Sequence, residues 1–390
     1  MKRDKTRRIL VVVNSLQAGG AEHAALRLTV DLSQNGNEVI LCTLRSDLDF
    51  YTVPYSVQRI SYGDIFSYPK NSKIRFLRLP LLKTLELCWL HFWAIRRYVR
   101  SIKPDIVIAF EALIGSAFAI SLVHTGVPII ISERVDPNPK VYAPHRIARL
   151  LRPWVYSHGA ICTVQSKGFQ KWVVDNWGVQ AFVTPNHLHD SEIIKNKKTN
   201  LKSCDNSNVI AVGRLVAQKD YSTLLKAWEI VEFKMPTAQL SIFGDGDRAA
   251  INQLIFESEL RNVKCFSAIP DILDKLARYK ILVSSSRFEG FPNVVLESLS
   301  CGIPVVATRS TDVIDDFVIN GGVKACNVSD YIGLANLIVE TISNDEEYQL
   351  MKGQALVTAM NYGWSKINPF WEEVLMAAQV SKGVRMVKCK

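Results

Sequence analysis

The segment SSRFEGFPNVVLESLSCGIPVVAT, Ser285–Thr308, decides the fold. The short apolar stretch just before it, Ile281–Ser284, predicts a buried strand, and Val305–Ala307 near its end predicts another. Between the two strands, Pro292 suits the first turn of a helix because its missing N–H would be unpaired there in any case. Gly302 is a typical helix stop. This strand–helix–strand order predicts a parallel sheet covered by helices.

The same alternation extends over most of the chain. In the first half we expect strands at Ile9–Val13, Glu38–Leu44, Ile106–Phe110, Ile129–Ser132 and Ala160–Val164. In the second half we expect further strands at Val209–Gly213, Leu240–Phe243 and Val263–Phe266. Helical patterns separate or follow them at Ala21–Gln34, Ser166–Asp175, Tyr221–Phe233, Ala249–Glu259, Tyr331–Ile342, Glu346–Met360 and from Ser365 to about Ala378. The fold class is therefore α/β, with two doubly wound, Rossmann-like domains in series.

The boundary between the two domains lies near a change in composition. Ile193–Asn208 is rich in lysine and asparagine and poor in apolar residues, so we expect an exposed linker there. A chain of 390 residues has the length of two domains, and we expect them at about 1–190 and 205–364. Two such domains leave a central cleft between the carboxyl ends of their sheets, where ligands of this architecture bind.

Charge and cysteine usage restrict the kind of partner and compartment. Residues 1–200 hold 27 Lys and Arg against 15 Asp and Glu, and the remainder holds 20 against 22, so an anionic partner is expected at the first half. The eight cysteines form no C-x-x-C pair, which favours reduced thiols in the cytoplasm and speaks against a zinc site. No stretch has the roughly 20 consecutive apolar residues needed to cross a bilayer.

Three loops that follow predicted strands have the chemistry of a phosphate site. Gly19-Gly20 opens a helix, and its backbone can approach an anion closely, although a simple turn is an equally good reading. In VGRLVAQKD, Arg214 and Lys219 offer a guanidinium fork and a point charge that suit a diphosphate. The third loop, FGDGD, brings the backbone at Gly244 close to a base or ribose.

The deciding segment also holds two carboxylates, Glu289 and Glu297, that can accept hydrogen bonds from hydroxyl groups. Glu289 lies in the loop before the predicted helix and Glu297 about one and a half turns inside it, so they are too far apart for a capping box. Two acceptor-only groups beside a helix N-terminus can hold two sets of hydroxyls while the N–H groups hold phosphate. Ribose, diphosphate and sugar together make a nucleotide-sugar.

At this point the residues resemble a known family, the retaining glycosyltransferases of the GT-B fold, specifically glycosyltransferase family 4. The segment from Glu289 to Glu297 matches the E-x7-E motif of that family. Five further motifs occur in the family's order and span nearly the whole chain: GGAE (Gly19–Glu22), SERVDP (Ser132–Pro137), TPNH (Thr184–His187), VGRLVAQKD (Val212–Asp220) and FGDGD (Phe243–Asp247).

The resemblance implies a role for each matching residue. Arg214 and Lys219 would bind the donor diphosphate and act in catalysis, and Glu297 would hold the ribose hydroxyls. Glu289 would act in catalysis and contact the donor sugar near its 3- and 4-hydroxyls. The other implied donor-binding residues are Gly19, Gly20, Gly244, Gly290, Phe291 and Asn293.

The resemblance also implies a mechanism and an architecture. Relatives transfer the sugar with retention, without a divalent metal and without a clearly placed enzyme nucleophile. Glu133 stands where many relatives have a histidine facing the donor sugar, and it is a candidate catalytic residue. The chain departs from the common patterns at Val135, His187 and Ser310–Asp312. The last helix, about 365–380, would pack back on the N-terminal domain.

The acceptor side is predicted from the span Lys73–Lys103, which holds eight basic residues, one acidic residue and five aromatics. One helical face should pack on the sheet, and Leu87, Leu90 and Trp93 lie off that face. The pattern is compatible either with a thick domain helix or with docking on an anionic membrane. With the resemblance, it favours a peripheral protein on the inner face of the cytoplasmic membrane that glycosylates a lipid-linked saccharide in surface-polysaccharide assembly.

Alternatives remain open at this stage. A nucleotide-sugar epimerase of GT-B fold shares the architecture, and a UDP-linked hexose or N-acetylhexosamine is preferred as donor over GDP-mannose from the subgroup resemblance alone. The full glycine fingerprint of a dehydrogenase is absent. No recognised nucleic-acid-binding module accompanies the sequence pI near 9.1.

Overall fold

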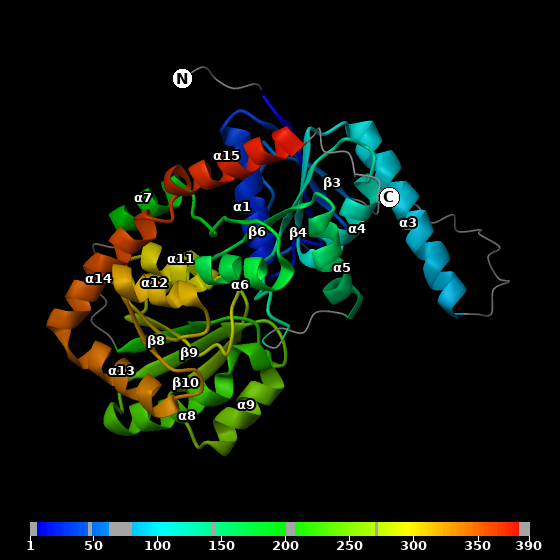
Figure 1. Ribbon diagram of the computed structural model, residues 1–390. Coiled ribbons are helices and arrows are strands. Elements are labelled where there is room, and N and C mark those ends of the chain that lie inside the picture. Colours follow the sequence, from blue (N-terminus) through cyan, green and yellow to red (C-terminus); the bar gives the residue numbers. More distant parts are fainter. Residues whose placement is uncertain are drawn as a thin grey trace. The chain divides into compact units, whose positions relative to one another are not determined.

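The computed structural model describes residues 6–45, 49–61, 80–139, 141, 146–199, 207–269 and 272–381. The chain divides into two compact units, Met1–Thr184 with Pro369–Lys390, and Pro185–Asn368. We call them unit 1 and unit 2. Each contains a parallel sheet with helices along it (Figure 1).

Unit 1 is built on a seven-stranded sheet with the order β3-β2-β1-β4-β5-β6-β7. Its strands are β1 (Arg8–Val13), β2 (Glu38–Thr43), β3 (Gln58–Ser61), β4 (Ile106–Phe110), β5 (Ile129–Ser132), β6 (Ile161–Val164) and β7 (Ala181–Val183). Its helices are α1 (Gly20–Gln34), α3 (Pro80–Ile102), α4 (Ala112–Leu122), α5 (Arg146–Ser157) and α6 (Lys167–Trp177), and α15 (Trp364–Ser381) enters it from unit 2.

Unit 2 is built on a six-stranded sheet with the order β10-β9-β8-β11-β12-β13. Its strands are β8 (Asn208–Val212), β9 (Gln239–Gly244), β10 (Val263–Ser267), β11 (Ile281–Ser284), β12 (Val305–Thr308) and β13 (Val323–Cys326). Its helices are α7 (Asp190–Thr199), α8 (Tyr221–Lys234), α9 (Arg248–Glu257), α10 (Ile272–Leu276), α11 (Asn293–Ser300), α12 (Asp312–Asn320), α13 (Tyr331–Ser343) and α14 (Asp345–Met360), with the short 3₁₀ turn η1 (Ala217–Lys219).

The apolar strands are buried on both faces of each sheet. In β8, Val209 and Ala211 belong to a hydrophobic cluster with α8 and α13, whereas Ile210 between them belongs to a second cluster with α11, α12 and α14. Successive side chains of a strand point to opposite faces, so a strand covered on both sides reads as a continuous apolar run. This explains why the sequence shows the strands so clearly and confirms the two predicted Rossmann-like sheets.

Each sheet grows outward from its first strand in both directions. In unit 1, β1 lies between β2 and β4, and in unit 2, β8 lies between β9 and β11. The loops that leave the carboxyl ends of the two central strands therefore diverge at these points. Such switch points are where open parallel sheets bind their ligands.

Part of the predicted linker is helical. Helix α7 occupies Asp190–Thr199, so the first half of Ile193–Asn208 is not an extended junction, and residues 200–206 lie outside the described part. Ile193 is buried, with 4% of its surface exposed, and belongs to the core of unit 2. Among the side chains of α7 that the structure describes, residues 190–194, Ile193 is the buried one, which fits the polar composition of this segment.

Helix α11 confirms the helix expected after the deciding loop, with a one-residue shift. Pro292 is its N-cap rather than its first helical residue, and the backbone N–H of Cys301 closes its end on the carbonyl of Glu297 at 3.3 Å. Gly302 follows at a φ of +64°, a left-handed conformation that favours glycine.

Helix α3 (Pro80–Ile102) covers most of the basic, aromatic span Lys73–Lys103. Ile95 and Val99 are buried in the sheet's core, as predicted, while 47% of Trp93 is exposed. Residues 73–79 and the side chains of Leu82, Leu85, Leu87, Trp89 and Leu90 lie outside the described part. Within the described residues, no helix combines the length and the apolar character that a bilayer crossing needs.

Candidate active site

The predicted diphosphate and sugar residues of unit 2 meet at its switch point. The loop with Arg214 and Lys219 leaves the carboxyl end of β8, and the loop with Glu289 leaves the carboxyl end of β11. These strands are direct neighbours in the sheet, with Val209 opposite Ile281. Residues about 70 positions apart in the sequence are thereby brought into contact.

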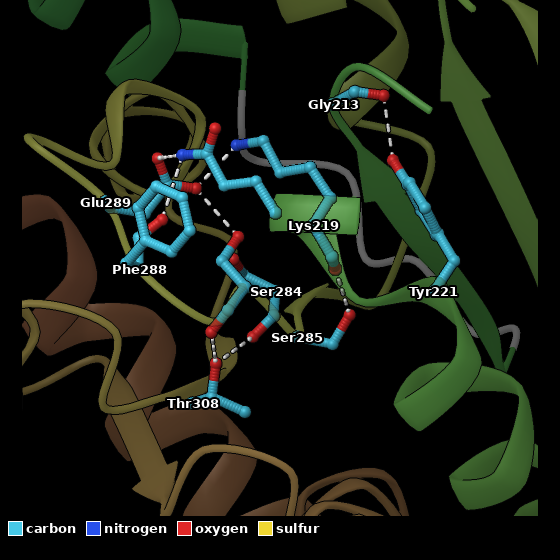
Figure 2. Close-up of polar contacts among 10 residues, drawn as sticks. Gly213, Lys219, Tyr221, Ser284, Ser285, Phe288, Glu289 and Thr308 are labelled. Atoms are coloured by element: carbon cyan, nitrogen blue, oxygen red, sulfur yellow. Dashed lines mark hydrogen bonds and ion pairs between the residues drawn. The ribbon is translucent and has the colours of Figure 1, made fainter. Parts of the chain in front are cut away.

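Lys219 and Glu289 form an ion pair in which Nζ lies 2.5 Å from Oε1 (Figure 2). The same oxygen accepts a hydrogen bond from Ser286 Oγ at 2.7 Å. The other oxygen, Oε2, lies 3.3 Å from Nε2 of Gln218. The side chains of Lys219 and Glu289 are 18% and 9% exposed, so solvent screens this pair only weakly. The carboxylate is thus held from three directions at the edge of the site.

The two loops are tied together by further bonds that do not involve Glu289. Gln218 Nε2 donates to the carbonyl of Phe288 at 2.9 Å, and the backbone N–H of Arg287 donates to the carbonyl of Gln218 at 2.8 Å. Ser285 Oγ donates to the carbonyl of Lys219, also at 2.8 Å (Figure 2). We refer to residues 217–220 and 285–289 together as the paired loops. Because they are bonded along their length, Lys219 and Glu289 are preorganised rather than brought together by a ligand.

Asp220 anchors the back of the paired loops. Its buried carboxylate accepts from the guanidinium of Arg287, with Nε 3.0 Å from Oδ2, and from Thr223 Oγ1 at 2.9 Å. Burial acts to raise the pKa of Asp220, but the hydrogen bonds from Arg287 and Thr223 outweigh it, so the pKa lies below its usual value. The backbone of Asp220 has a φ of +47°, a region that aspartate tolerates better than most residues.

The third strand of this region, β12, supports the loop from below. Thr308, which is fully buried, donates through Oγ1 to the carbonyl of Ser286 at 2.6 Å (Figure 2). The backbone N–H of Glu289 donates to the carbonyl of Ser310 at 3.0 Å. The position of Glu289 is therefore fixed through its main chain as well as its side chain.

Arg214 and Gly213 stand at the start of the β8 loop. The Arg214 side chain is exposed, and its guanidinium makes no hydrogen bond or ion pair with the residues that the structure describes. Tyr221 OH donates to the carbonyl of Gly213 at 2.8 Å (Figure 2). Of the two predicted phosphate ligands, Lys219 is already paired with Glu289, whereas Arg214 is exposed to solvent.

The remaining predicted donor-binding residues of unit 2 lie around α11. Glu297 is a buried residue of that helix, 5% exposed. Phe291 packs edge-on against Phe317, with ring centroids 6.0 Å apart, so its side chain belongs to the core. Asn293 Oδ1 accepts from Asn186 Nδ2 at 2.6 Å. Gly244 ends β9, and Gly290 is buried beside Glu289.

In unit 1, Gly19 is the N-cap residue of α1 and Gly20 is the first residue of that helix. The carboxylate of Glu22 folds back over this N-terminus, with Oε2 2.1 Å from where a Cβ on Gly19 would be. Tyr51 stacks on His23 with centroids 4.5 Å apart and donates through OH to the carbonyl of Gly19 at 3.3 Å. A carboxylate therefore already lies at the helix end where a phosphate is predicted.

Glu133 is buried in unit 1, with 1% of its surface exposed. Its two carboxylate oxygens accept from Arg152 Nη2 at 2.6 Å and from Tyr156 OH at 2.5 Å. Burial, with nearby negative charge, raises the pKa of Tyr156 well above its ordinary value, so its hydroxyl keeps the proton that it donates. These are the contacts of a buried structural ion pair. A catalytic role for Glu133 stays a prediction.

The contacts add residues that the sequence reading did not single out: Asn186, Gln218, Ser286 and Thr308. Gln218 is the neighbour of Lys219 in its loop, and Ser286 precedes Glu289 by three positions. Their closeness in the sequence to these two predicted site residues is the signal that could have indicated them. Among the residues that the structure describes, no three His, Cys, Asp or Glu side chains are grouped as metal ligands would be.

Two sequence models, both of glycosyltransferase families, match different parts of this chain. The sequence model described as Glycosyltransferase Family 4 matches residues 18–190, and the one described as Glycosyl transferases group 1 matches residues 206–344. An uncharacterised glycosyltransferase of Haemophilus influenzae is 23% identical over 93% of this chain and 98% of its own.

Two further proteins resemble this chain over most of its length. The N-acetylgalactosamine-N,N'-diacetylbacillosaminyl-diphospho-undecaprenol 4-alpha-N-acetylgalactosaminyltransferase of Campylobacter jejuni is 24% identical over 76% of this chain and 80% of its own. The structure of Anabaena HepE in complex with UDP and glucose superposes with a TM-score of 0.76, at 17% identity, over 95% of this chain and 99% of that one. The last likeness concerns the fold, and it identifies the two sheets as the GT-B arrangement.

Proposed function

This chain belongs to the glycosyltransferases of family 4 and group 1, and on that basis we propose that it moves a hexose or N-acetylhexosamine from a UDP-sugar to a lipid-linked saccharide. That the chain is a glycosyltransferase follows from the two matching family models and from its relatives. The donor, the stereochemistry and the acceptor are the proposed part.

The ion pair between Lys219 and Glu289 at the switch point of unit 2 carries the proposal. A cation and a hydroxyl acceptor, fixed side by side, fit the junction between a diphosphate and a sugar. Arg214, on the same loop and open to solvent, supplies a second cation for the diphosphate. The three residues fit the reacting end of a nucleotide-sugar.

A UDP-linked donor and a lipid-linked acceptor are supported by relatives. The Anabaena structure of the same fold holds UDP and glucose, and the Campylobacter relative is named for a diphospho-undecaprenol acceptor. The excess of basic residues in the first half of this chain suits an acceptor that carries phosphate.

We propose that transfer retains the anomeric configuration and needs no divalent metal. When the bond between sugar and diphosphate breaks, negative charge develops on the leaving oxygen. Arg214 and Lys219 would stabilise that charge, a task for which a metal ion is otherwise used. The test is turnover in the presence of EDTA, with the configuration of the product read from its anomeric proton coupling.

Helix α3 is the proposed contact with the inner face of the cytoplasmic membrane. Trp93, Arg97 and Arg100 are exposed on its described part. Arg96, in contrast, donates to the carbonyl of Val123 at 2.9 Å and is committed to holding the helix end of α4. A fair test neutralises Arg97 and Arg100 and leaves Arg96 in place.

The membrane experiment is flotation with liposomes that contain anionic lipid. The control variant is Arg261→Gln, Lys264→Gln, in which both replaced residues are exposed in unit 2. The wild type and this control should float with the liposomes, and the Arg97→Gln, Arg100→Gln variant should stay in the bottom fraction of the gradient. Equal partitioning of all three proteins would discard docking through α3 without affecting the proposed transfer reaction.

The donor experiment is calorimetry with UDP, GDP and NAD in metal-free buffer. We expect UDP to bind the wild type and the exposed-site control Glu229→Gln, and to bind Glu297→Gln at least tenfold more weakly, because a charged hydrogen bond to ribose is lost. Melting temperatures of the variants separate lost binding from lost folding. Preference for GDP would change the donor, and binding of neither nucleotide would refute the nucleotide-sugar site.

A further inference from the structure

We propose that Gln218 and Ser286 are positioning residues that divide the two oxygens of Glu289 between different tasks. Oε1 is committed to the protein, and Oε2, together with the amide oxygen of Gln218, is the surface that reads the hydroxyls of the donor sugar. This inference rests on the proposed function and extends it to the choice of sugar.

Oxygen Oε1 of Glu289 has no capacity left. A carboxylate oxygen accepts about two hydrogen bonds, and Oε1 already accepts from Lys219 Nζ at 2.5 Å and from Ser286 Oγ at 2.7 Å. Both bonds are short, and one is charge-assisted. A sugar hydroxyl that approached Oε1 would have to displace the lysine or the serine.

Oxygen Oε2 is in a different state. Its hydrogen bond from Gln218 Nε2 is long, at 3.3 Å, while the same amide nitrogen makes the shorter bond of 2.9 Å to the carbonyl of Phe288. The amide is therefore held chiefly by the main chain. Oε2 keeps the capacity to accept a further bond, and its direction is limited by the neighbouring amide.

The orientation of the Gln218 amide follows from its neighbours. The Phe288 carbonyl and the Glu289 carboxylate both accept hydrogen bonds, so the amide must turn its NH₂ group toward them. Its oxygen then points to the other side, and it accepts no hydrogen bond from the residues that the structure describes. The site therefore presents two adjacent acceptors, the charged Oε2 of Glu289 and the neutral amide oxygen of Gln218.

Two adjacent acceptors suit a pair of neighbouring sugar hydroxyls. Each hydroxyl has one hydrogen to donate, and a donor analogue that lacks one of them would leave a partly buried acceptor unpaired. Sites built to bind a hydroxyl reject the deoxygenated analogue far more strongly than apolar pockets reject a missing methylene. Gln218 and Ser286 thus contribute to sugar selectivity without touching the nucleotide.

The experiment compares the wild type with Gln218→Ala, Gln218→Glu and Ser286→Ala, and with Gln349→Ala as an exposed control. Binding of UDP alone is measured by calorimetry. Transfer or hydrolysis of UDP-glucose and of its 3-deoxy and 4-deoxy analogues gives kcat and KM for each protein. UDP lacks the sugar, so it reports on the nucleotide site alone.

We expect UDP to bind the wild type, Gln218→Ala, Ser286→Ala and Gln349→Ala within about threefold, while kcat/KM for UDP-glucose falls about 10- to 100-fold in Gln218→Ala and Ser286→Ala. In Gln218→Ala the preference for the parent donor over one deoxy analogue should collapse to a few-fold. Gln218→Glu should be the slowest, because it sets a second carboxylate against Glu289.

Four results would overturn the inference. UDP binding that falls together with kcat/KM would mean that Gln218 and Ser286 only support the fold of the site. Wild-type discrimination in Gln218→Ala would mean that the sugar is read elsewhere. A wild type that binds UDP but no UDP-sugar would refute both this inference and the proposed donor, whereas unchanged variants of an active wild type would refute the inference alone.

Discussion

The carbonyl oxygen of Gly213 lies 2.2 Å from the position that a Cβ on Gly244 would occupy. The two glycines stand at the carboxyl ends of the neighbouring strands β8 and β9, where the chain must turn out of the sheet. Tyr221 OH donates to the same carbonyl, so that oxygen cannot move aside without losing a buried partner. The absence of a side chain at Gly244 is therefore a steric requirement at the base of the candidate site.

Replacing Gly244 by alanine should destabilise the protein by about 1–3 kcal/mol, because the new methyl group meets main-chain atoms. The matched control is Gly353→Ala, in the exposed middle of α14, where a Cβ meets nothing within 4 Å. That change should stabilise by about 0.5–1 kcal/mol through the lower entropy of the unfolded chain. Thermal melting of both variants tests this steric explanation. Equal shifts of the melting temperature in the two variants would contradict it.

Removing the charge of Lys219 should affect catalysis far more than folding. We expect Lys219→Ala to lower kcat on the order of 100- to 1000-fold, as loss of an electrostatic contact to developing charge does. The carboxylate of Glu289 keeps its bonds to Ser286 and Gln218 but loses its counter-charge, so we expect a loss of stability of only about 1–3 kcal/mol beside the much larger loss of kcat. Lys226→Ala, exposed on α8, is the control. Wild-type turnover in a folded Lys219→Ala enzyme would remove Lys219 from the mechanism.

Glu133 offers a test between a structural and a catalytic role. If its pairing with Arg152 is structural, Glu133→Gln should cost about 3–5 kcal/mol, since the variant leaves a buried guanidinium without its counter-charge. Glu373→Gln, exposed on α15, should leave stability unchanged. Denaturant unfolding gives the free energies. A stable Glu133→Gln protein with a large loss of kcat would instead support the predicted catalytic role.

The pH dependence of stability should report the pair of Asp220 with Arg287. The folded pKa of Asp220 is below its ordinary value of 3.8, so its contribution is fully present above that value and is lost as pH falls through the lower folded pKa. Arg287 is 53% exposed, which limits the contribution to about 1 kcal/mol. Asp220→Asn should therefore be less stable than the wild type at pH 5–7 and should approach it below pH 3.8. A constant difference across this range would contradict the assignment.

The central strands and the deciding loop could be predicted because their determinants are local. Burial on both faces makes β1, β4, β8 and β11 continuous apolar runs, and the proline and glycine around α11 mark its ends. The sequence predicted that the loops of Lys219 and Glu289 leave the same edge of one sheet, but it did not predict the ion pair between the two side chains.

Other helices and strands could not be predicted because their sequence patterns are weak or ambiguous. Helix α4, ALIGSAFAISL, is apolar on all sides and has no helical period, and β3 is a four-residue edge strand of mostly polar residues. The roles of Gln218 and Ser286 depend on side-chain direction across the two loops, which spacing does not give. In unit 1 the contacts of Glu133 depend on Arg152, nineteen positions away and inside a helix that the sequence did not reveal.

The bonds that fasten the paired loops to one another have an evolutionary consequence. Lys219, Glu289 and the groups that hold them all come from residues 213–310, so this arrangement can be inherited as one block. If the acceptor binds to residues 1–184, as the basic excess there predicts, sequence change in that part can alter the acceptor without rebuilding these bonds. Descendants of one ancestral enzyme could diversify the glycans that they build while keeping a common sugar-nucleotide chemistry, and an engineer could graft the block between members of the family for the same reason.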